Sequence, residues 1–196
     1  IDFDIEEVGR PQTIDWYEGC KLETISFGHG ITTTILQLAK GYAIIANGGY
    51  DIKPTLIKKD RDKKNKREKI LKNDVSEKMN SILRKVVSEG TAKQVNVEGY
   101  LVGGKTGTAQ QPIGKEYSNI KINTLASIFP TNNPKYVLIV MLESPKTASE
   151  YVYNYRYKEG SFKGSPFNTA GWTSVEAAGK IIERIGPILA TKYVEN

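Results

Sequence analysis

Two apolar runs of strand length, joined by a proline-rich turn, most constrain the fold of this chain. Residues 124–129 read Thr-Leu-Ala-Ser-Ile-Phe, and residues 136–143 read Tyr-Val-Leu-Ile-Val-Met-Leu-Glu. Residues 130–134 between them, Pro-Thr-Asn-Asn-Pro, are typical of a turn, so the two runs are predicted to form a β-hairpin. Because both runs are continuously apolar rather than alternating, we expect both faces of their sheet to be covered.

Apolar residues at helical spacing predict three helices. We expect them at 32–46, 74–89 and 173–185. The first is expected to end at Asn47-Gly48-Gly49, because glycine tolerates the left-handed conformation of a helix C-cap. Gly186-Pro187 is expected to end the last one, since proline disrupts a helix interior.

The remaining segments complete the expected architecture. Residues 50–57 are typical of a strand, and the polar, Tyr-rich stretch 144–172 is expected to be a long loop. The prediction is an α/β (α+β) fold in which helices flank an antiparallel sheet of at least three strands. Those strands are expected at 100–110, 124–129 and 136–143.

Composition excludes several classes of protein. Of the 196 residues, 39% are hydrophobic and 26% are charged, which is typical of a globular domain, and no run is long enough to span a membrane. Cys20 and His29 are the only residues of their types, so an intrachain disulfide and a multi-histidine zinc site are both excluded. We expect no metal and no cofactor.

The net charge of +6 comes from one segment. Residues 58–72 hold nine Lys/Arg and three Asp/Glu, whereas charges in the remainder balance. The segment has no aromatic residue that could stack on bases, so a solvated surface loop is favoured over a nucleic-acid site. A nucleic-acid-binding module remains an alternative, although we expect no nucleic-acid partner.

The segment Gly99-Tyr-Leu-Val-Gly-Gly104-Lys105-Thr106 matches the phosphate-binding pattern GxxxxGK[ST] in letters. That pattern requires Lys and Thr to open a helix whose N-terminus faces the phosphates. Here the residues before Lys105 resemble a strand, and Gly107 and Pro112 follow it. This context argues against a nucleotide-binding loop.

The alternative interpretation places Lys105-Thr106-Gly107 within a strand. Lys-Thr-Gly is one of three motifs of the penicillin-recognising serine enzymes. The lysine places a cation at the site, the glycine lets a substrate approach the backbone closely, and neighbouring hydroxyls can bind a carboxylate.

The residues around this triplet resemble class B penicillin-binding proteins, and most closely the cell-division peptidoglycan D,D-transpeptidases. The resemblance runs from about residue 20 to 190, in the order and with roughly the spacing of the family. The segments that carry it are Ile25-Ser26-Phe27-Gly28-His29-Gly30, Thr34–Ala39, Ala46-Asn47-Gly48-Gly49, Val86–Ala92, Val97–Tyr100, Gly104–Gln110, Asn133–Tyr136 and Leu142–Pro145.

The resemblance implies roles for the residues of the motif. Lys105 would stand beside the nucleophile and help to place the substrate. Thr106 and Thr108 would bind the carboxylate of a D-Ala-D-Ala stem peptide or of a β-lactam. The backbone N–H of Thr108 would form half of an oxyanion hole, and Gly107 would give clearance. The implied fold is part of the penicillin-binding transpeptidase, or β-lactamase-like, fold.

Two motifs that the family needs do not have their expected counterparts. No Ser-x-Asn occurs in the sequence, and Ser118-Asn-Ile-Lys121 matches Ser-x-x-Lys only after the Lys-Thr-Gly triplet. Residues 1–196 are therefore expected to be the C-terminal part of one transpeptidase domain, inactive without its upstream half.

The resemblance also implies partners and a location. Besides the stem peptide, β-lactams and the upstream half of the domain, the partners would be divisome membrane proteins. The parent protein would lie on the periplasmic side of the bacterial inner membrane, held by an anchor that this chain lacks. A β-lactam sensor or a β-lactamase relative is the alternative function.

Overall fold

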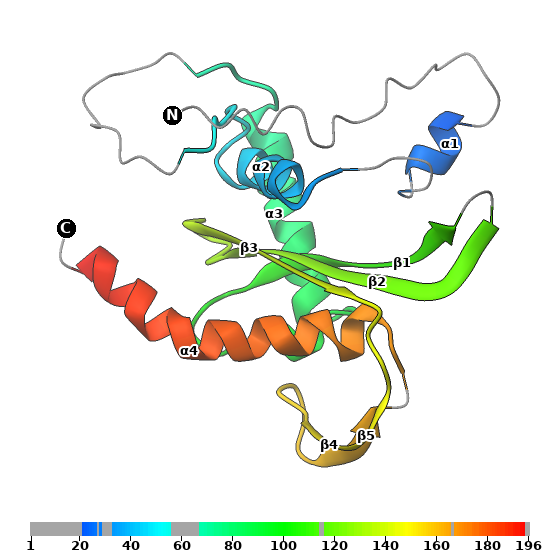
Figure 1. Ribbon diagram of the computed structural model, residues 1–196. Helices are drawn as coiled ribbons and strands as arrows, with labels where there is room; N and C mark the ends of the chain where they lie inside the picture. The colour runs from blue at the N-terminus through cyan, green and yellow to red at the C-terminus, as the bar shows by residue number, and fades with distance from the viewer. Residues whose placement is uncertain are drawn as a thin grey trace.

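A computed structural model describes residues 21–26, 28, 33–55, 67–113, 116–165 and 167–194. Its elements are α1 (Lys21–Ser26), α2 (Ile35–Ala46), α3 (Asn73–Ser88), η2 (Lys93–Val95), β1 (Gly103–Ile113), β2 (Glu116–Phe129), β3 (Tyr136–Glu143), β4 (Ala148–Asn154), β5 (Ser161–Ser165), η3 (Ala170–Trp172) and α4 (Ser174–Val194). Figure 1 shows β1, β2 and β3 as one twisted sheet with helices on either side and the β4–β5 hairpin below it.

The central sheet has the order β1-β2-β3, and both pairings are antiparallel. The β2–β3 register runs without a shift from Ile122 opposite Glu143 to Phe129 opposite Tyr136, which confirms the predicted hairpin. The ladder between β1 and β2 is regular from Gly103 to Gln110 and shifts only beyond that point. β2 begins earlier than predicted because it continues to pair with the distal part of β1.

Helices cover both faces of this sheet, as the apolar runs predict. Residues 125, 129 and 140 of β2 and β3 are buried against residues 175, 178 and 182 of α4. On the opposite face, Ile128 packs with Ala46 of α2 and Leu83 of α3. In Figure 1, α4 lies below the sheet, whereas α2 and the start of α3 lie above it.

Local sequence signals set the ends of α2. Thr34 is its N-cap, and the Thr34 hydroxyl accepts a hydrogen bond from Gln37 N at 3.1 Å while the Gln37 side chain accepts one from Thr34 N at 3.0 Å. This reciprocal pair satisfies two backbone donors of the first turn. At the other end, Gly48 and Gly49 adopt φ values of 88° and 91°. The predicted stop is therefore confirmed, whereas the helix begins at Ile35 rather than at residue 32.

The prediction that Gly186-Pro187 ends the last helix is wrong, because α4 continues to Val194. A Cβ at Gly186 would lie 2.4 Å from the ring of Tyr100, so this glycine provides room for the tyrosine. Beyond Pro187, Leu189 packs against the core, and the Tyr136 hydroxyl donates to the Leu189 carbonyl at 3.2 Å. Tertiary packing therefore maintains the helix past a residue that disfavours it locally.

Two further predictions need correction. The described part of 50–57 is not a strand, because it forms only an isolated bridge between Tyr50 and Lys69. The stretch 144–172 is not an irregular loop, because it contains β4, β5 and η3. In both cases the outcome depends on whether the segment finds another strand to pair with, which a local residue pattern does not predict.

An ionic network holds the β4–β5 hairpin on α4. Arg156 donates to the Glu183 carboxylate at 2.6 and 2.9 Å and to Glu176 Oε2 at 3.1 Å. Gln94 of η2 donates to the same Glu176 oxygen at 2.8 Å. The hydrogen bonds from Arg156 hold the pKa of the Glu183 carboxyl below its ordinary value. The hairpin is thereby held to α4 and to η2.

The burial of α4 leads to a matched test of the core. Ile182 is fully buried in the main core, whereas Ile188 on the same helix is 63% exposed. We expect Ile182→Ala to lower the free energy of unfolding by about 2–5 kcal/mol, because it removes buried methylene groups and leaves a cavity. Ile188→Ala should change it by less than about 0.5 kcal/mol. Urea unfolding monitored by circular dichroism measures both, and equal losses would contradict the placement of α4.

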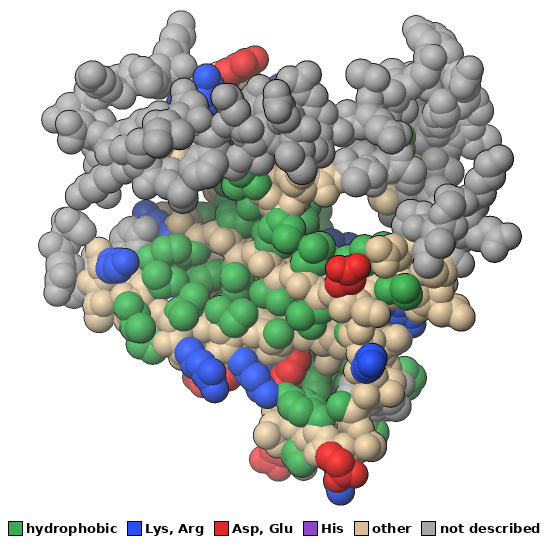
Figure 2. Space-filling view, viewed as in Figure 1, with side chains coloured by type: hydrophobic (Ala, Val, Ile, Leu, Met, Phe, Trp, Pro, Cys, Tyr) green, Lys and Arg blue, Asp and Glu red, His purple; other side chains and the backbone are tan. Residues whose placement is uncertain are grey.

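β3 forms the outer edge of the sheet among the described residues, and Figure 2 shows hydrophobic side chains gathered across this face. An apolar edge favours pairing with another strand. We therefore expect the chain to self-associate through β3 or to accept a partner strand there. Met141, which is 44% exposed on β3, offers a test: Met141→Lys should shift light scattering toward the monomer.

Thr147→Lys adds the same charge at an exposed position outside the edge and should leave the association unchanged. A wild-type chain that is a clean monomer, with slow amide exchange limited to the pairings described above, would count against an open edge at β3.

Candidate functional site

The Lys-Thr-Gly triplet lies in the middle of β1, the edge strand opposite β3. Lys105 pairs with Ala126 across the β1–β2 ladder, and Gly107 pairs with Thr124. Within the described sheet, β1 has a neighbour on one side only, so its other backbone edge is open to an extended ligand. The side chains of Lys105 and Thr108 are exposed, and that of Thr106 is half-buried.

The alternation of a strand divides the four motif residues between two faces. Thr106 and Thr108 lie on the face that α4 covers, together with their partners Leu125 and Asn123. Lys105 lies on the other face, and its ammonium donates to the Thr106 carbonyl at 2.9 Å. The structure brings the two hydroxyls onto one surface but does not bring the ammonium beside them.

Each of the two hydroxyls has a defined partner. Thr106 Oγ1 lies 2.9 Å from Thr91 Oγ1, in the segment that follows α3. Thr108 Oγ1 accepts a hydrogen bond from the Ala170 backbone N–H at 3.0 Å. Because that bond uses a lone pair of Thr108, its hydroxyl hydrogen stays available as a donor.

A polar layer beneath β1 holds Ala170 in place. Asn123, which is fully buried and opposite Thr108, donates from its amide to the Asn168 carbonyl and to Thr173 Oγ1, both at 2.7 Å. The Asn123 Oδ1 atom is buried without a partner among the described residues. Asn123 therefore fixes the segment that delivers the Ala170 N–H to Thr108.

Gly107 keeps the surface of the strand open. A Cβ at this position would meet nothing closer than Thr124 Cβ at 3.9 Å, so packing does not require a glycine here. Any larger side chain would instead project from the exposed strand. The position is thus suited to close approach of a ligand to the backbone.

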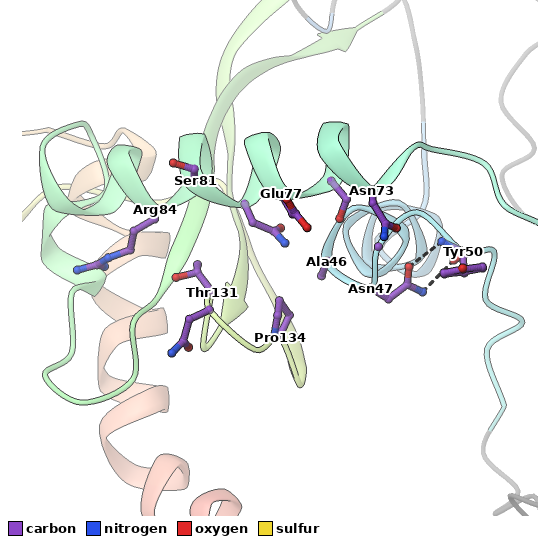
Figure 3. A pocket seen from close by; sticks show the side chains of 13 residues that line it. Ala46, Asn47, Tyr50, Asn73, Glu77, Ser81, Arg84, Thr131 and Pro134 are labelled. Carbon is purple, nitrogen blue, oxygen red and sulfur yellow. Dashed lines mark hydrogen bonds between the residues drawn. The ribbon is translucent and has the colours of Figure 1, made fainter.

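The described cavities lie away from this strand. A cavity of about 600 Å³ opens between α2, α3 and the β2–β3 turn, and Figure 3 shows Glu77 and Asn47 among its polar lining. A second, of about 480 Å³, lies between Tyr100, Tyr136 and the end of α4. None of residues 105–108 lines either of these two cavities.

The tyrosines of the β4–β5 segment pack the hairpin onto the domain. Tyr153 is buried, its ring centroid lies 4.9 Å from that of Trp172, and burial raises the pKa of its hydroxyl. Tyr155 and Tyr157 extend the stack at successive centroid distances of 5.4 Å. Tyr151 donates to Glu176 Oε1 at 2.9 Å. These contacts favour a packing role over a substrate-lining role.

The Ser118-x-x-Lys121 match does not form a nucleophile and base. Both residues belong to β2, where the spacing of three places their side chains on opposite faces. The Ser118 hydroxyl donates to the Gln111 carbonyl at 2.8 Å, and the Lys121 ammonium donates to Asn168 Oδ1 at 2.7 Å.

The phosphate-binding pattern also lacks its required context. Lys105 and Thr106 are internal to β1 and open no helix. The described residues contain no group of three or more His, Cys, Asp or Glu side chains that could hold a metal. Cys20 and His29 lie outside the described residues, as does most of the basic segment 58–72.

Three residues of the site were not assigned a role from the sequence. Thr91 stood within a segment that resembles the family, so it carried a signal, although nothing indicated its contact with Thr106. No sequence signal indicated a role for Asn123 or Ala170, because their roles depend on the fold of the 144–172 region.

Comparisons with known proteins agree with this arrangement. The family model for the penicillin binding protein transpeptidase domain matches residues 1–163. "Probable peptidoglycan D,D-transpeptidase FtsI" of Caulobacter vibrioides is 30% identical over 200 residues, which cover 96% of this chain and 32% of that protein. "Stage V sporulation protein D" of Bacillus subtilis is 31% identical over 139 residues, covering 65% of this chain and 22% of that protein.

Solved structures show the same fold. The apo TP domain of Burkholderia pseudomallei penicillin-binding protein 3 superposes with a TM-score of 0.72 at 24% identity, covering 92% of this chain and 50% of that one. Penicillin-binding protein 3 of Mycobacterium tuberculosis superposes with a TM-score of 0.65 at 26% identity, and the match covers 88% of this chain and 40% of that one.

The chain spans about a third or less of the curated relatives and half or less of the solved chains. No helix in the described part of the chain is long and apolar enough to cross a bilayer. The match over residues 1–163 and the shared fold show that the chain belongs to the transpeptidase domain family of class B penicillin-binding proteins.

Proposed function

We propose that this chain supplies the Lys-Thr-Gly strand of a serine-type D,D-transpeptidase that cross-links peptidoglycan during cell division. The observation that carries the proposal is the position of the motif. Lys105, Thr106, Gly107 and Thr108 occupy an exposed edge strand whose outer side has no neighbour in the described sheet. An extended stem peptide can lie along such an edge and pair with its backbone.

Each motif residue then has a defined task. The Thr106 and Thr108 hydroxyls donate to the terminal carboxylate of the stem peptide or to the carboxylate of a β-lactam, and Lys105, on the other face of the strand, stands beside the nucleophile and helps to place the substrate. The Thr108 N–H is half of the oxyanion hole, a contribution of about 3–4 kcal/mol in comparable sites. Gly107 provides the clearance that lets the substrate reach the strand.

The nucleophile in this proposal is a serine outside the described site. Its oxygen attacks the penultimate carbonyl, the bond to the terminal D-Ala breaks, and that residue leaves with the serine proton. An amine then displaces the serine and completes the cross-link. Ser118 does not suit this role because its hydroxyl donates to the backbone carbonyl of Gln111 in the neighbouring strand β1.

The remaining parts of the proposal concern partners. The upstream half of the domain would bring the Ser-x-x-Lys and Ser-x-Asn motifs and pair with the open edge of β3. The parent protein would be anchored at the periplasmic side of the inner membrane, and divisome membrane proteins would be its partners there. The relatives named FtsI support a role in division.

Covalent labelling by penicillin tests where the nucleophile lies. We expect no adduct in the intact mass of this chain alone, and one adduct in its mixture with an upstream half, located on the upstream peptide. An adduct on the 196-residue chain alone would place the nucleophile within it and overturn the assignment. Rapid turnover of a chromogenic cephalosporin would instead favour a β-lactamase relative.

Substitution of the lysine tests the motif itself. In the mixture of this chain with its upstream half, Lys105→Ala should slow acylation by penicillin about 10–100-fold, because it removes the cation that the proposal places beside the nucleophile. Lys163→Ala is the matched control, since Lys163 is an exposed lysine on β5 paired with Glu150. Stopped-flow acylation rates measure both, and equal rates for the two variants would contradict the role of Lys105.

A further inference from the structure

The Thr91 hydroxyl is a part of the site that the proposed function does not use. Thr91 follows the end of α3, its side chain is exposed, and its Oγ1 lies 2.9 Å from Thr106 Oγ1. The two residues are 15 positions apart, so the contact results from the docking of α3 beside β1.

The backbone around Thr91 is fixed from the core side. The next residue, Ala92, is fully buried in the main core, and its N–H donates to the Val86 carbonyl at 3.1 Å. On the other side, the Thr91 carbonyl lies close enough to Gly171 that a Cβ there would approach it to 3.2 Å. The hydroxyl therefore extends from a held backbone toward the exposed surface of β1.

The count of hydrogens shows what this contact can do. Two hydroxyls bring two hydrogens, and only one of these lies between the two oxygens. The hydrogen between the two oxygens fixes the orientation of the two hydroxyls, and the other hydrogen stays available to a ligand. Thr108 is prepared in the same way, because its oxygen accepts the Ala170 N–H and keeps its own hydrogen for donation.

We propose that Thr91 is a positioning residue that orients the Thr106 hydroxyl toward the carboxylate of the bound substrate. The hydroxyls of Thr91, Thr106 and Thr108 then form one row. The segment after α3 supports the row through Thr91, and the segment before α4 supports it through the Ala170 N–H bound to Thr108. This inference rests on the proposed function, since it assigns a further residue to the same carboxylate site.

Paired substitutions test this role against a purely structural one. In the mixture of this chain with its upstream half, Thr91→Val should slow acylation by benzylpenicillin about tenfold, because the Thr106 hydroxyl loses the partner that orients it. The same variant should change acylation by the benzylpenicillin methyl ester less than twofold, since the ester carries no carboxylate. Thr91→Ser restores the hydroxyl and should stay within twofold of wild type with both compounds.

Thr191→Val is the control for the loss of a threonine hydroxyl, because Thr191 is exposed on α4 and bonds only locally, to the Ile188 carbonyl. It should leave both acylation rates unchanged. If Thr91→Val slowed acylation by penicillin and by its ester equally, Thr91 would have a purely structural role and the inference would be overturned. No loss with either compound would overturn it as well.

A second measurement separates this inference from the proposed function. The 196-residue chain is titrated with N-acetyl-D-alanyl-D-alanine while the amide signals of Thr106 and Thr108 are followed by nuclear magnetic resonance. Wild type and Thr91→Ser should show saturable shifts, and Thr91→Val should bind at least about fivefold more weakly. If the wild type binds in this way but no protein is acylated, the transpeptidase proposal fails and the role of Thr91 stands. If the wild-type signals do not shift, the inference fails.

Discussion

The antiparallel pairing of β1 with β2 is the interaction on which the rest of the described structure depends. Because side chains alternate along a strand, the register that places Gly103 opposite Ile128 decides which motif residue faces which layer. A slip of one residue would exchange Lys105 with Thr106 and turn the hydroxyls toward the wrong face. The sandwich of helices around the sheet holds this register, since Leu125 and Ile128 are fully buried on opposite faces.

Beneath the motif, the core changes from apolar to polar. Leu125, opposite Thr106, contributes to the main hydrophobic core, whereas Asn123, opposite Thr108, is equally buried and binds the segment before α4. The two donor bonds of the Asn123 amide, to the Asn168 carbonyl and to Thr173 Oγ1, hold the segment before α4 against the exposed strand.

The β4–β5 hairpin illustrates how a polar segment can still be well anchored. Its attachment combines the Arg156 ion pairs to Glu176 and Glu183 with the packing of Tyr153 on Trp172. The Arg156–Glu176 pair is largely removed from water, whereas the Glu183 side chain is 45% exposed. Ion pairs of both kinds are specific in their geometry but contribute little net stability, so here they fix the position of the hairpin on α4, while the aromatic contacts bury apolar surface.

The amino-acid sequence by itself determined the elements whose signals are local. The apolar runs and their turn predicted the β2–β3 hairpin, the Asn47-Gly48-Gly49 signal predicted the end of α2, and the residues around Lys105 indicated both a strand and the family. These features follow from backbone preference and hydrophobic period, which act within a few residues.

Only the tertiary structure decided the features that depend on distant partners. Packing against Tyr100 and the core extends α4 beyond Pro187, and contacts with α4 and η2 order a hairpin where the composition indicated a loop. The neighbours of the two threonines, Thr91 and Ala170, come from segments 15 and 62 residues away in the sequence. Such contacts are set by how whole elements dock, because hydrogen-bond geometry tolerates errors of only a few tenths of an ångström, and no local pattern encodes that docking.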